Sequence, residues 1–268
     1  HEKDLPAGPF WWQSPDGSRV LACRPPLHYC SPESEDMTER IYAAAQDAPT
    51  LPEVTLEPMQ VVAQADDGLP LRGDFYVVDP NRPTVLLLHQ LYTTRRSWAE
   101  TIPILLGAHF NVLAVDLRGY GRTGGSINWQ AAISDVQAWL NWLRLEGGVR
   151  GDAISIMGSS MGSALAIRGC AQDSACKTAI ALSPGRAYFG VDVLEALEVG
   201  MAGRRTLIIY AERDRFPALG VPLMAEVAPE GTLEVMTQGG NAHGMALLAR
   251  DADALYPAIV AWLQHMGG

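Results

Sequence analysis

Positive charge is scarce in this sequence. Its 268 residues include 20 Lys and Arg against 30 Asp and Glu, which gives a formal net charge of −10. Surfaces that bind nucleic acid or an anionic membrane need clustered Lys and Arg. We therefore expect neither kind of partner, and the composition is that of an acidic soluble protein.

Long apolar runs are missing as well. No apolar run approaches the roughly 18 residues that a membrane-spanning helix needs, so we expect a chain that is not embedded in a membrane. The chain opens on His1 rather than Met, and from this we expect that a leader or a tag has been removed.

Cysteine is rare, and its four residues form two close pairs, Cys23 with Cys30 and Cys170 with Cys176. Neither pair has the C-x-x-C spacing of redox and zinc sites. Three connectivities are possible, but short loops close most readily, so the spacing favours two local disulfides over free thiols. Because disulfides persist in oxidising compartments, we expect a secreted, periplasmic or surface-anchored protein.

The chain divides into a short N-terminal extension, residues 1–52, and one large α/β domain, residues 53–268. In the extension, Trp11 and Trp12 precede a Pro-Asp-Gly turn, which predicts a hairpin, and residues 35–46 have the composition of a helix. A Cys23–Cys30 disulfide would cross-link it. The extension is compatible with shielding a sheet edge, tethering the domain or covering part of a cleft, and its composition does not choose among these.

The rest of the chain predicts a doubly wound, mostly parallel sheet with helices on both faces. Continuous apolar runs such as 84–88 and 111–115 are typical of strands buried on both faces. Apolar residues at spacings of three and four predict a helix over 126–146, and a last helix is expected to start near Pro257. The predicted strands are 59–65, 71–78, 84–88, 111–115, 153–157, 178–182, 206–210 and 233–236.

A Gly-x-Ser-x-Gly pattern, Gly158 to Gly162, stands between a predicted strand and a helix-forming run. A serine at the tip of a sharp strand-to-helix turn needs small residues two positions before and after it. We therefore interpret Ser160 as a nucleophile. The backbone N–H of Met161 is the natural first donor to an oxyanion. The alternative is a Gly/Ser-rich turn without chemistry.

A serine hydroxyl needs a base, and His243 is the histidine best placed to supply it. It follows the last strand on a glycine-rich loop, from which it can reach a serine at a strand end. His89 ends a strand but belongs beside the oxyanion region. The remaining candidates lie in segments without other chemical signals: His28, His109 and His265.

The base needs a carboxylate to orient it, and Asp214 follows the preceding strand. Glu212 is the near competitor, and a helix N-cap or a loop salt bridge is the structural alternative for Asp214. The order Ser160, Asp214, His243 is the order in which α/β-hydrolases carry their triad.

With these residues in view, the sequence from about 56 to 265 resembles the α/β-hydrolase superfamily, nearer its dienelactone-hydrolase and prolyl-peptidase-like esterase branches. Residues 116–126 resemble the family's structural loop after the fourth strand. Leu88-His89-Gln90-Leu91 matches the place of the family's His-Gly-x, which implies the Leu91 N–H as second oxyanion donor. Gln90 departs from the usual glycine, so its side chain either narrows the loop or contributes its own amide.

The resemblance implies a serine hydrolase that cleaves carboxylic esters through an acyl-enzyme and needs no metal or organic cofactor. A peptidase or thioesterase would use the same triad, a non-catalytic binding module would keep the fold, and a haloperoxidase-like or lyase activity is a further rival. We expect a monomer.

The interval between Ser183 and Thr206 leaves room only for a short helix, predicted over 191–199, so we expect no large cap. An open site is compatible with small-molecule, bulky or polymeric esters. Five side chains on strand-end loops are predicted to contact substrate, with ordinary packing as the alternative for each aromatic one: Gln90, Tyr92, Tyr188, Phe189 and Phe216.

Overall fold

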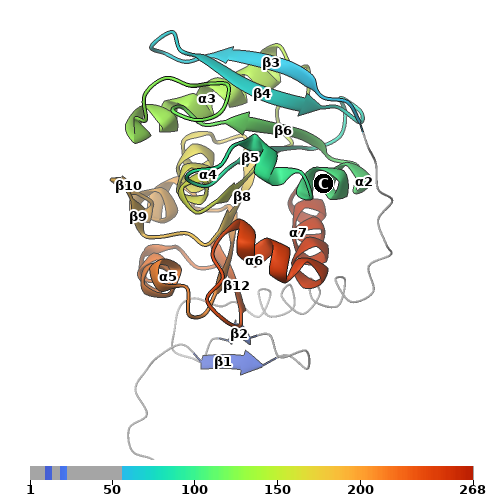
Figure 1. Cartoon of the computed structure of the whole chain (residues 1–268). Helices are drawn as coiled ribbons and strands as arrows, with labels where there is room; N and C mark the ends of the chain where they lie inside the picture. The colour runs from blue at the N-terminus through green and yellow to red at the C-terminus, as the bar shows by residue number, and fades with distance from the viewer. Residues whose placement is uncertain (1–9, 14–18, 23–55, 268) are drawn as a thin grey trace, which may run out of the picture.

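A ten-stranded sheet forms the centre of the molecule (Figure 1), in the order β1-β2-β12-β11-β8-β7-β5-β6-β4-β3. The structure is a computed structural model that describes residues 10–13, 19–22 and 56–267. The strands are β1 (Phe10–Gln13), β2 (Arg19–Ala22), β3 (Met59–Gln64), β4 (Pro70–Tyr76), β5 (Thr84–Leu88), β6 (Asn111–Asp116), β7 (Ile154–Ser159), β8 (Cys176–Leu182), β11 (Arg205–Ala211) and β12 (Leu233–Gln238).

The six central strands, from β12 across to β6, all pair in parallel. Antiparallel pairs flank them, with β4 and β3 at one edge and β2 and β1 at the other. The predicted doubly wound, mostly parallel sheet is therefore confirmed. Because parallel strands end at the same edge, the loops that follow β5, β7, β11 and β12 gather at one side of the sheet.

Helices cover both faces of the sheet and define two separate cores. Alternate residues of each central strand enter opposite cores; in β5, for example, Leu86 and Leu88 face one core and Val85 and Leu87 the other. The first core is covered by α3 (Trp129–Leu145), α4 (Met161–Gln172) and α5 (Arg215–Val227). The second is covered by α2 (Thr101–Gly107), α6 (Met245–Arg250) and α7 (Ala252–Gly267), with the short 3₁₀ helix η1 (Arg95–Trp98) beside it.

Two expectations about where helices begin are wrong. The last helix, α7, begins at Ala252 and not near Pro257, because the Asp251 carbonyl already accepts the N–H groups of Ala254 and Leu255. Pro257 therefore stands inside the helix and removes one internal hydrogen bond, while buried Leu255 and Ala258 anchor the helix on the sheet.

The helix predicted over 191–199 begins at residue 194 and not at 191. Its first residues form β10 (Val191–Asp192), which pairs with β9 (Ala187–Tyr188) around a two-residue turn. Both turn residues, Phe189 and Gly190, have left-handed φ values of 48° and 83°, as a tight hairpin requires. Residues 194–200 are helical, first at Leu194 and Glu195 and then as the π-helical turn η2 (Ala196–Gly200), so most of the predicted interval is helical.

The loop after β6 is structural, in keeping with its resemblance. Buried Asp116 accepts the N–H groups of Arg95 and Arg122, at 2.9 and 2.7 Å, and pairs with the Arg95 guanidinium. Arg95 also binds Asp74 of β4 at 2.6 Å. These contacts hold the loop that follows β5 against β6 and β4.

One of the two predicted disulfides lies in the described residues: Cys170 of α4 is bonded to Cys176 of β8. Cys23 and Cys30, the predicted helix over 35–46 and the boundary after residue 52 lie outside them. The strands of the predicted N-terminal hairpin pair antiparallel as β1 and β2, and β2 also pairs with β12. Within the described ranges, no helix has both the length and the apolar character that crossing a membrane requires.

Candidate active site

Ser160 stands between β7 and α4 in a backbone conformation that serine rarely adopts, with φ 51° and ψ −115°. Its own N–H donates to the Leu182 carbonyl of the neighbouring strand at 2.8 Å. A Cβ on Gly158 would lie 2.0 Å from the Gly162 carbonyl oxygen, and one on Gly162 would lie 2.2 Å from the Leu88 oxygen. The tight turn therefore requires glycine at both positions. This is the steric argument by which the sequence predicts Ser160 as a nucleophile.

His243 and Asp214 join Ser160 in one line of hydrogen bonds. The Ser160 hydroxyl lies 2.7 Å from His243 Nε2, and His243 Nδ1 lies 2.6 Å from Asp214 Oδ2. Asp214 is buried at the start of α5, and His243 lies in the loop between β12 and α6. With Nδ1–H donating to the carboxylate, Nε2 is left to accept the serine proton. The structure thus brings together the three residues that the sequence selected.

The competing residues lie in other surroundings. His109 is exposed in a turn after α2, and His265 is exposed near the end of α7. His28 lies outside the described residues. Asp214, and not Glu212 two residues before it, provides the carboxylate that accepts the bond from His243.

The N–H groups of Met161 and Leu91 are available as oxyanion donors. Met161 is the first residue of α4, where helical N–H groups have no partner within the helix, and the helix dipole favours negative charge. Leu91 follows the end of β5. Within the described part of the chain, neither N–H donates to a protein acceptor.

His89 holds the loop that presents Leu91. Its ring is fully buried, its Nε2 accepts the Leu117 N–H at 3.0 Å, and its Nδ1 lies 2.7 Å from the Gln90 carbonyl oxygen. These partners require a neutral ring with the proton on Nδ1. Burial lowers the pKa of His89, which keeps the ring in this form.

Gln90 directs its carboxamide oxygen toward the protein. This oxygen accepts the Met245 N–H at 3.0 Å and the Ser159 hydroxyl at 3.1 Å. The carboxamide oxygen therefore acts as an acceptor for the strand end before Ser160 and for the loop that carries His243. Sequence reasoning placed it with the substrate-contacting residues and had no signal for these partners.

The aromatic residues predicted to contact substrate differ in exposure. Tyr188 is buried and its hydroxyl donates to the Ser183 carbonyl at 3.0 Å; burial and the nearby Asp214 charge raise the pKa of Tyr188. Its ring meets Phe216 edge-on, with 5.9 Å between centroids. Tyr92, Phe189 and Phe216 are 90%, 63% and 60% exposed.

Two aromatic residues that the sequence interpretation did not select extend this group. Trp129 packs against Phe189 at 6.0 Å and stacks on Tyr120 at 6.2 Å, and Tyr120 meets His89 edge-on. Trp129 lies in the segment predicted as a helix over 126–146, and it is only half-buried, unlike Trp139 and Trp142. These ring contacts run from His89, in the loop after β5, through Tyr120 and Trp129 to Phe189, in the β9–β10 turn.

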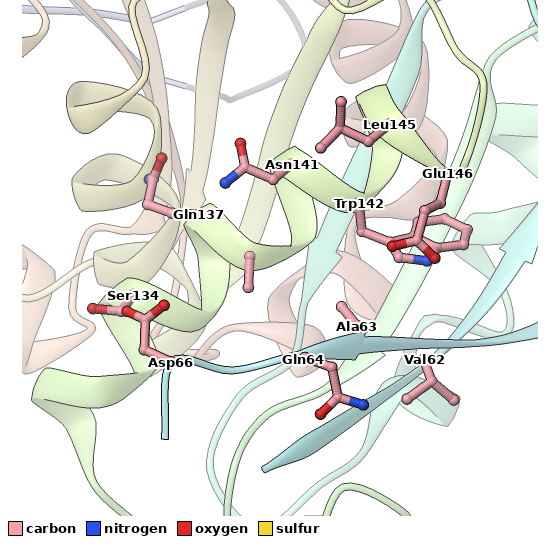
Figure 2. A pocket seen from close by; sticks show the side chains of 11 residues that line it. Val62, Ala63, Gln64, Asp66, Ser134, Gln137, Asn141, Trp142, Leu145 and Glu146 are labelled. Atoms are coloured by element: carbon pink, nitrogen blue, oxygen red, sulfur yellow. The ribbon is translucent and has the colours of Figure 1, made fainter. Parts of the chain in front are cut away.

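A surface hollow of about 500 Å³ lies elsewhere, between β3 and α3. Figure 2 shows the side chains that line it, among them Gln137, Asn141 and Leu145 of α3 and Gln64 of β3. Its walls contain none of Ser160, Asp214 or His243, so it is separate from the candidate active site.

Comparisons with known proteins agree with this architecture. A family model described as the alpha/beta hydrolase fold matches residues 83–216, half of the chain. Among curated proteins, epoxide hydrolase B of Mycobacterium tuberculosis is 47% identical over 45 residues, 17% of this chain and 13% of that enzyme. The match therefore covers a small part of the relative.

Solved structures resemble a much larger part of the chain. An esterase of Pyrococcus furiosus superposes with a TM-score of 0.68 at 21% identity, over 81% of this chain and 97% of its own. EstE1, a thermophilic carboxylesterase cloned from a metagenomic library, superposes with a TM-score of 0.61 at 17% identity, over 86% and 97%. At these identities the likeness is one of fold.

Proposed function

The chain belongs to the alpha/beta hydrolase fold family, and on that basis we propose that it is a serine hydrolase that cleaves carboxylic esters through an acyl-enzyme. The observation that supports the proposal most is the line of short hydrogen bonds from Ser160 through His243 to Asp214. This line lies at the edge of the sheet where the parallel strands end, and among the described residues the Met161 and Leu91 N–H groups have no protein acceptor.

In the proposed reaction, Ser160 Oγ attacks the ester carbonyl carbon while its proton passes to His243 Nε2. The carbonyl oxygen becomes an oxyanion that accepts hydrogen bonds from the Met161 and Leu91 N–H groups, each worth about 3 kcal/mol of barrier. The intermediate collapses, the C–O bond to the alcohol breaks, and His243 returns the proton to the leaving oxygen. Water then attacks the acyl-enzyme with His243 as base, and release of the acid restores Ser160.

Replacing the nucleophile tests this assignment. We expect Ser160→Ala to lower kcat on p-nitrophenyl esters by about 10³-fold or more with an unchanged melting temperature, because the attacking oxygen is lost and the fold is not. Ser134→Ala, an exposed serine of α3, is the matched control and should retain wild-type kcat. Wild-type turnover by Ser160→Ala would contradict the proposal.

For substrate, we propose esters with bulky apolar groups, polymeric esters included. Tyr92 and Phe189 expose large rings from left-handed backbone, with φ values of 59° and 48°. Such a conformation costs about 1 kcal/mol or more for a non-glycine residue, and exposure recovers little of it. A role in binding an apolar group accounts for both rings.

Truncating these rings tests the substrate class. We expect Tyr92→Ala and Phe189→Ala to raise KM about 10-fold for aromatic esters, and to slow the clearing of polyester or lipid emulsions, because each ring contributes contact area to binding. Hydrolysis of vinyl acetate, which is too small to reach the rings, should not change. Leu145→Ala serves as the control, because Leu145 is also an exposed apolar residue but lines the separate hollow between β3 and α3. Equal losses on acetate would contradict a role in selecting bulky groups.

We also propose that the protein acts outside the cytosol. The Cys170–Cys176 disulfide supports this, because reducing compartments do not maintain structural disulfides. Thiol titration of the unfolded, unreduced protein should then find no free cysteine, and four free thiols would contradict it.

A further inference from the structure

Hydrogen bonds to other strand ends, in addition to the packing of Ala242 and Met245 against the second core, order the loop that carries His243. The His243 side chain is 35% exposed, and the residues after it enter the short helix α6. The first N–H groups of a helix have no partner inside the helix, so their order depends on outside acceptors. In this loop the acceptors are the side chains of Ser183, which follows β8, and Gln90, which follows β5.

Gly244 and Met245, the two residues directly after His243, each donate their N–H to a buried or half-buried side chain. The Gly244 N–H binds Ser183 Oγ at 2.9 Å, and the Met245 N–H binds Gln90 Oε1 at 3.0 Å. Gln90 Oε1 also accepts the hydroxyl of Ser159, the neighbour of the nucleophile, at 3.1 Å. One carboxamide oxygen therefore joins the strand that carries Ser160 to the loop that carries His243.

The fit around this oxygen is close. Gly244 has a φ of 55°, and a Cβ at this position would lie 2.4 Å from Gln90 Oε1 and 2.5 Å from Ser159 Oγ. The absence of a side chain at residue 244 is thus what admits the Gln90 carboxamide between the two loops.

The main chain of Gln90 also makes hydrogen bonds. Its carbonyl oxygen accepts hydrogen bonds from His89 Nδ1 at 2.7 Å and from the Thr93 hydroxyl at 2.8 Å. These bonds fix the loop whose next residue, Leu91, presents the proposed oxyanion donor. Gln90 is therefore in contact with both the oxyanion side and the base side of the site.

We propose that Gln90 is a positioning residue that holds His243 in line with Ser160 by anchoring the first turn of α6 to the loop after β5. The inference rests on the proposed function for its kinetic consequence. It does not require Gln90 to touch the substrate: its carboxamide oxygen orders the base through the Met245 N–H, and its backbone orders the Leu91 N–H.

The kinetic test replaces the acceptor without changing the size of the side chain. Gln90→Met should lower kcat by about 10- to 100-fold while KM changes less than about 2-fold, because misplacing the base slows the chemical step and leaves substrate contacts intact. Gln137→Met is the matched control: Gln137 of α3 donates to the Gly169 carbonyl at 2.9 Å and lines the hollow of Figure 2, whose walls contain none of the three proposed catalytic residues. It should lose stability and keep its kcat.

A spectroscopic test reads the position of His243 without turnover. The short Nδ1–H bond to Asp214 should give a low-field proton NMR signal in the wild type, and this signal should shift or broaden in Gln90→Met but persist in Gln137→Met. If the wild type hydrolyses no ester, the proposed function fails, and this signal still decides the role of Gln90.

The result that would overturn the inference is a folded Gln90→Met protein with wild-type kcat and an unchanged low-field signal. If that variant does not fold, Gln90→Gly replaces it, since glycine fits any backbone conformation and carries no side chain to misplace. Wild-type kcat in Gln90→Gly would overturn the inference equally.

Discussion

At the scale of single residues, the site depends on one buried histidine that takes no part in the proposed chemistry. His89 accepts a backbone N–H at Nε2, so protonation there would set two donors against each other. Its pKa is lowered by burial, whereas an unfolded chain binds a proton near pH 6.5.

We therefore expect acid to destabilise the protein through His89. Above about pH 6.5 the ring is neutral in both states; below it the unfolded chain takes up a proton that the native ring refuses, so stability falls as pH falls. The slope from this group is at most about 1.4 kcal/mol per pH unit. Urea unfolding at pH 7.5, 6.5 and 5.5 measures it.

His89→Gln provides the comparison, because a carboxamide can accept from Leu117 and donate to the Gln90 carbonyl without titrating. The variant should be less stable at neutral pH and should lose less stability between pH 6.5 and 5.5 than the wild type. Parallel losses in both proteins would exclude His89 as the titrating group.

Single residues were predictable from sequence where local geometry selects them. Ser160 could be recognised because Gly158 and Gly162 are required by contacts within the same turn and with β5. Asp214 and His243 followed from their order after strand ends. The role of Gln90 could not be predicted, because its partner Met245 is 155 residues away in sequence and the bond goes to a backbone N–H, which any residue offers.

At the scale of elements, the junction between α4 and β8 shows how a helix end is stabilised. The Arg204 guanidinium donates to the carbonyls of Cys170, Asp173 and Cys176 at 2.8, 2.7 and 3.0 Å. The last carbonyls of a helix have no partner within it, and a cation there also complements the helix dipole. The Cys170–Cys176 disulfide closes the same junction.

We expect Arg204→Met to lower the free energy of unfolding by about 3 kcal/mol, because three carbonyl groups lose a charged donor in a part-buried place. Chemical denaturation measures the change. Arg150→Met is the control: Arg150 is exposed and pairs with Asp152 at 3.4 Å, so its loss should cost less than about 1 kcal/mol. Similar losses for the two variants would contradict the role given to Arg204.

Elements were predictable where one physical signal dominated. Continuous apolar runs identified the central strands to within one or two residues, since only strands covered on both faces carry them. The start of α7 was not predictable from Pro257, because the preceding turn is held by tertiary burial of Leu255. The start of the helix predicted over 191–199 was not predictable either, because its first two residues pair as a strand through a turn that Phe189 adopts against its own preference.

At the scale of the whole molecule, the sheet order decides where chemistry can occur. Strands β5, β7, β11 and β12 are far apart in sequence yet end at one edge, so the loops that follow them gather there and Ser160, Asp214 and His243 are joined by hydrogen bonds. The parallel order could be inferred from alternating strands and helices. The contacts of Trp129 with Tyr120 and Phe189 could not be inferred from the sequence, since they depend on the paths of two loops.

The measurement that tests the central claim most directly is intact-mass spectrometry before and after treatment with a fluorophosphonate, followed by peptide mapping. The account predicts one adduct, on Ser160, in the wild type and none in Ser160→Ala, because only an activated serine reacts at an appreciable rate. No adduct on the folded wild type, or an adduct on another serine, would contradict it.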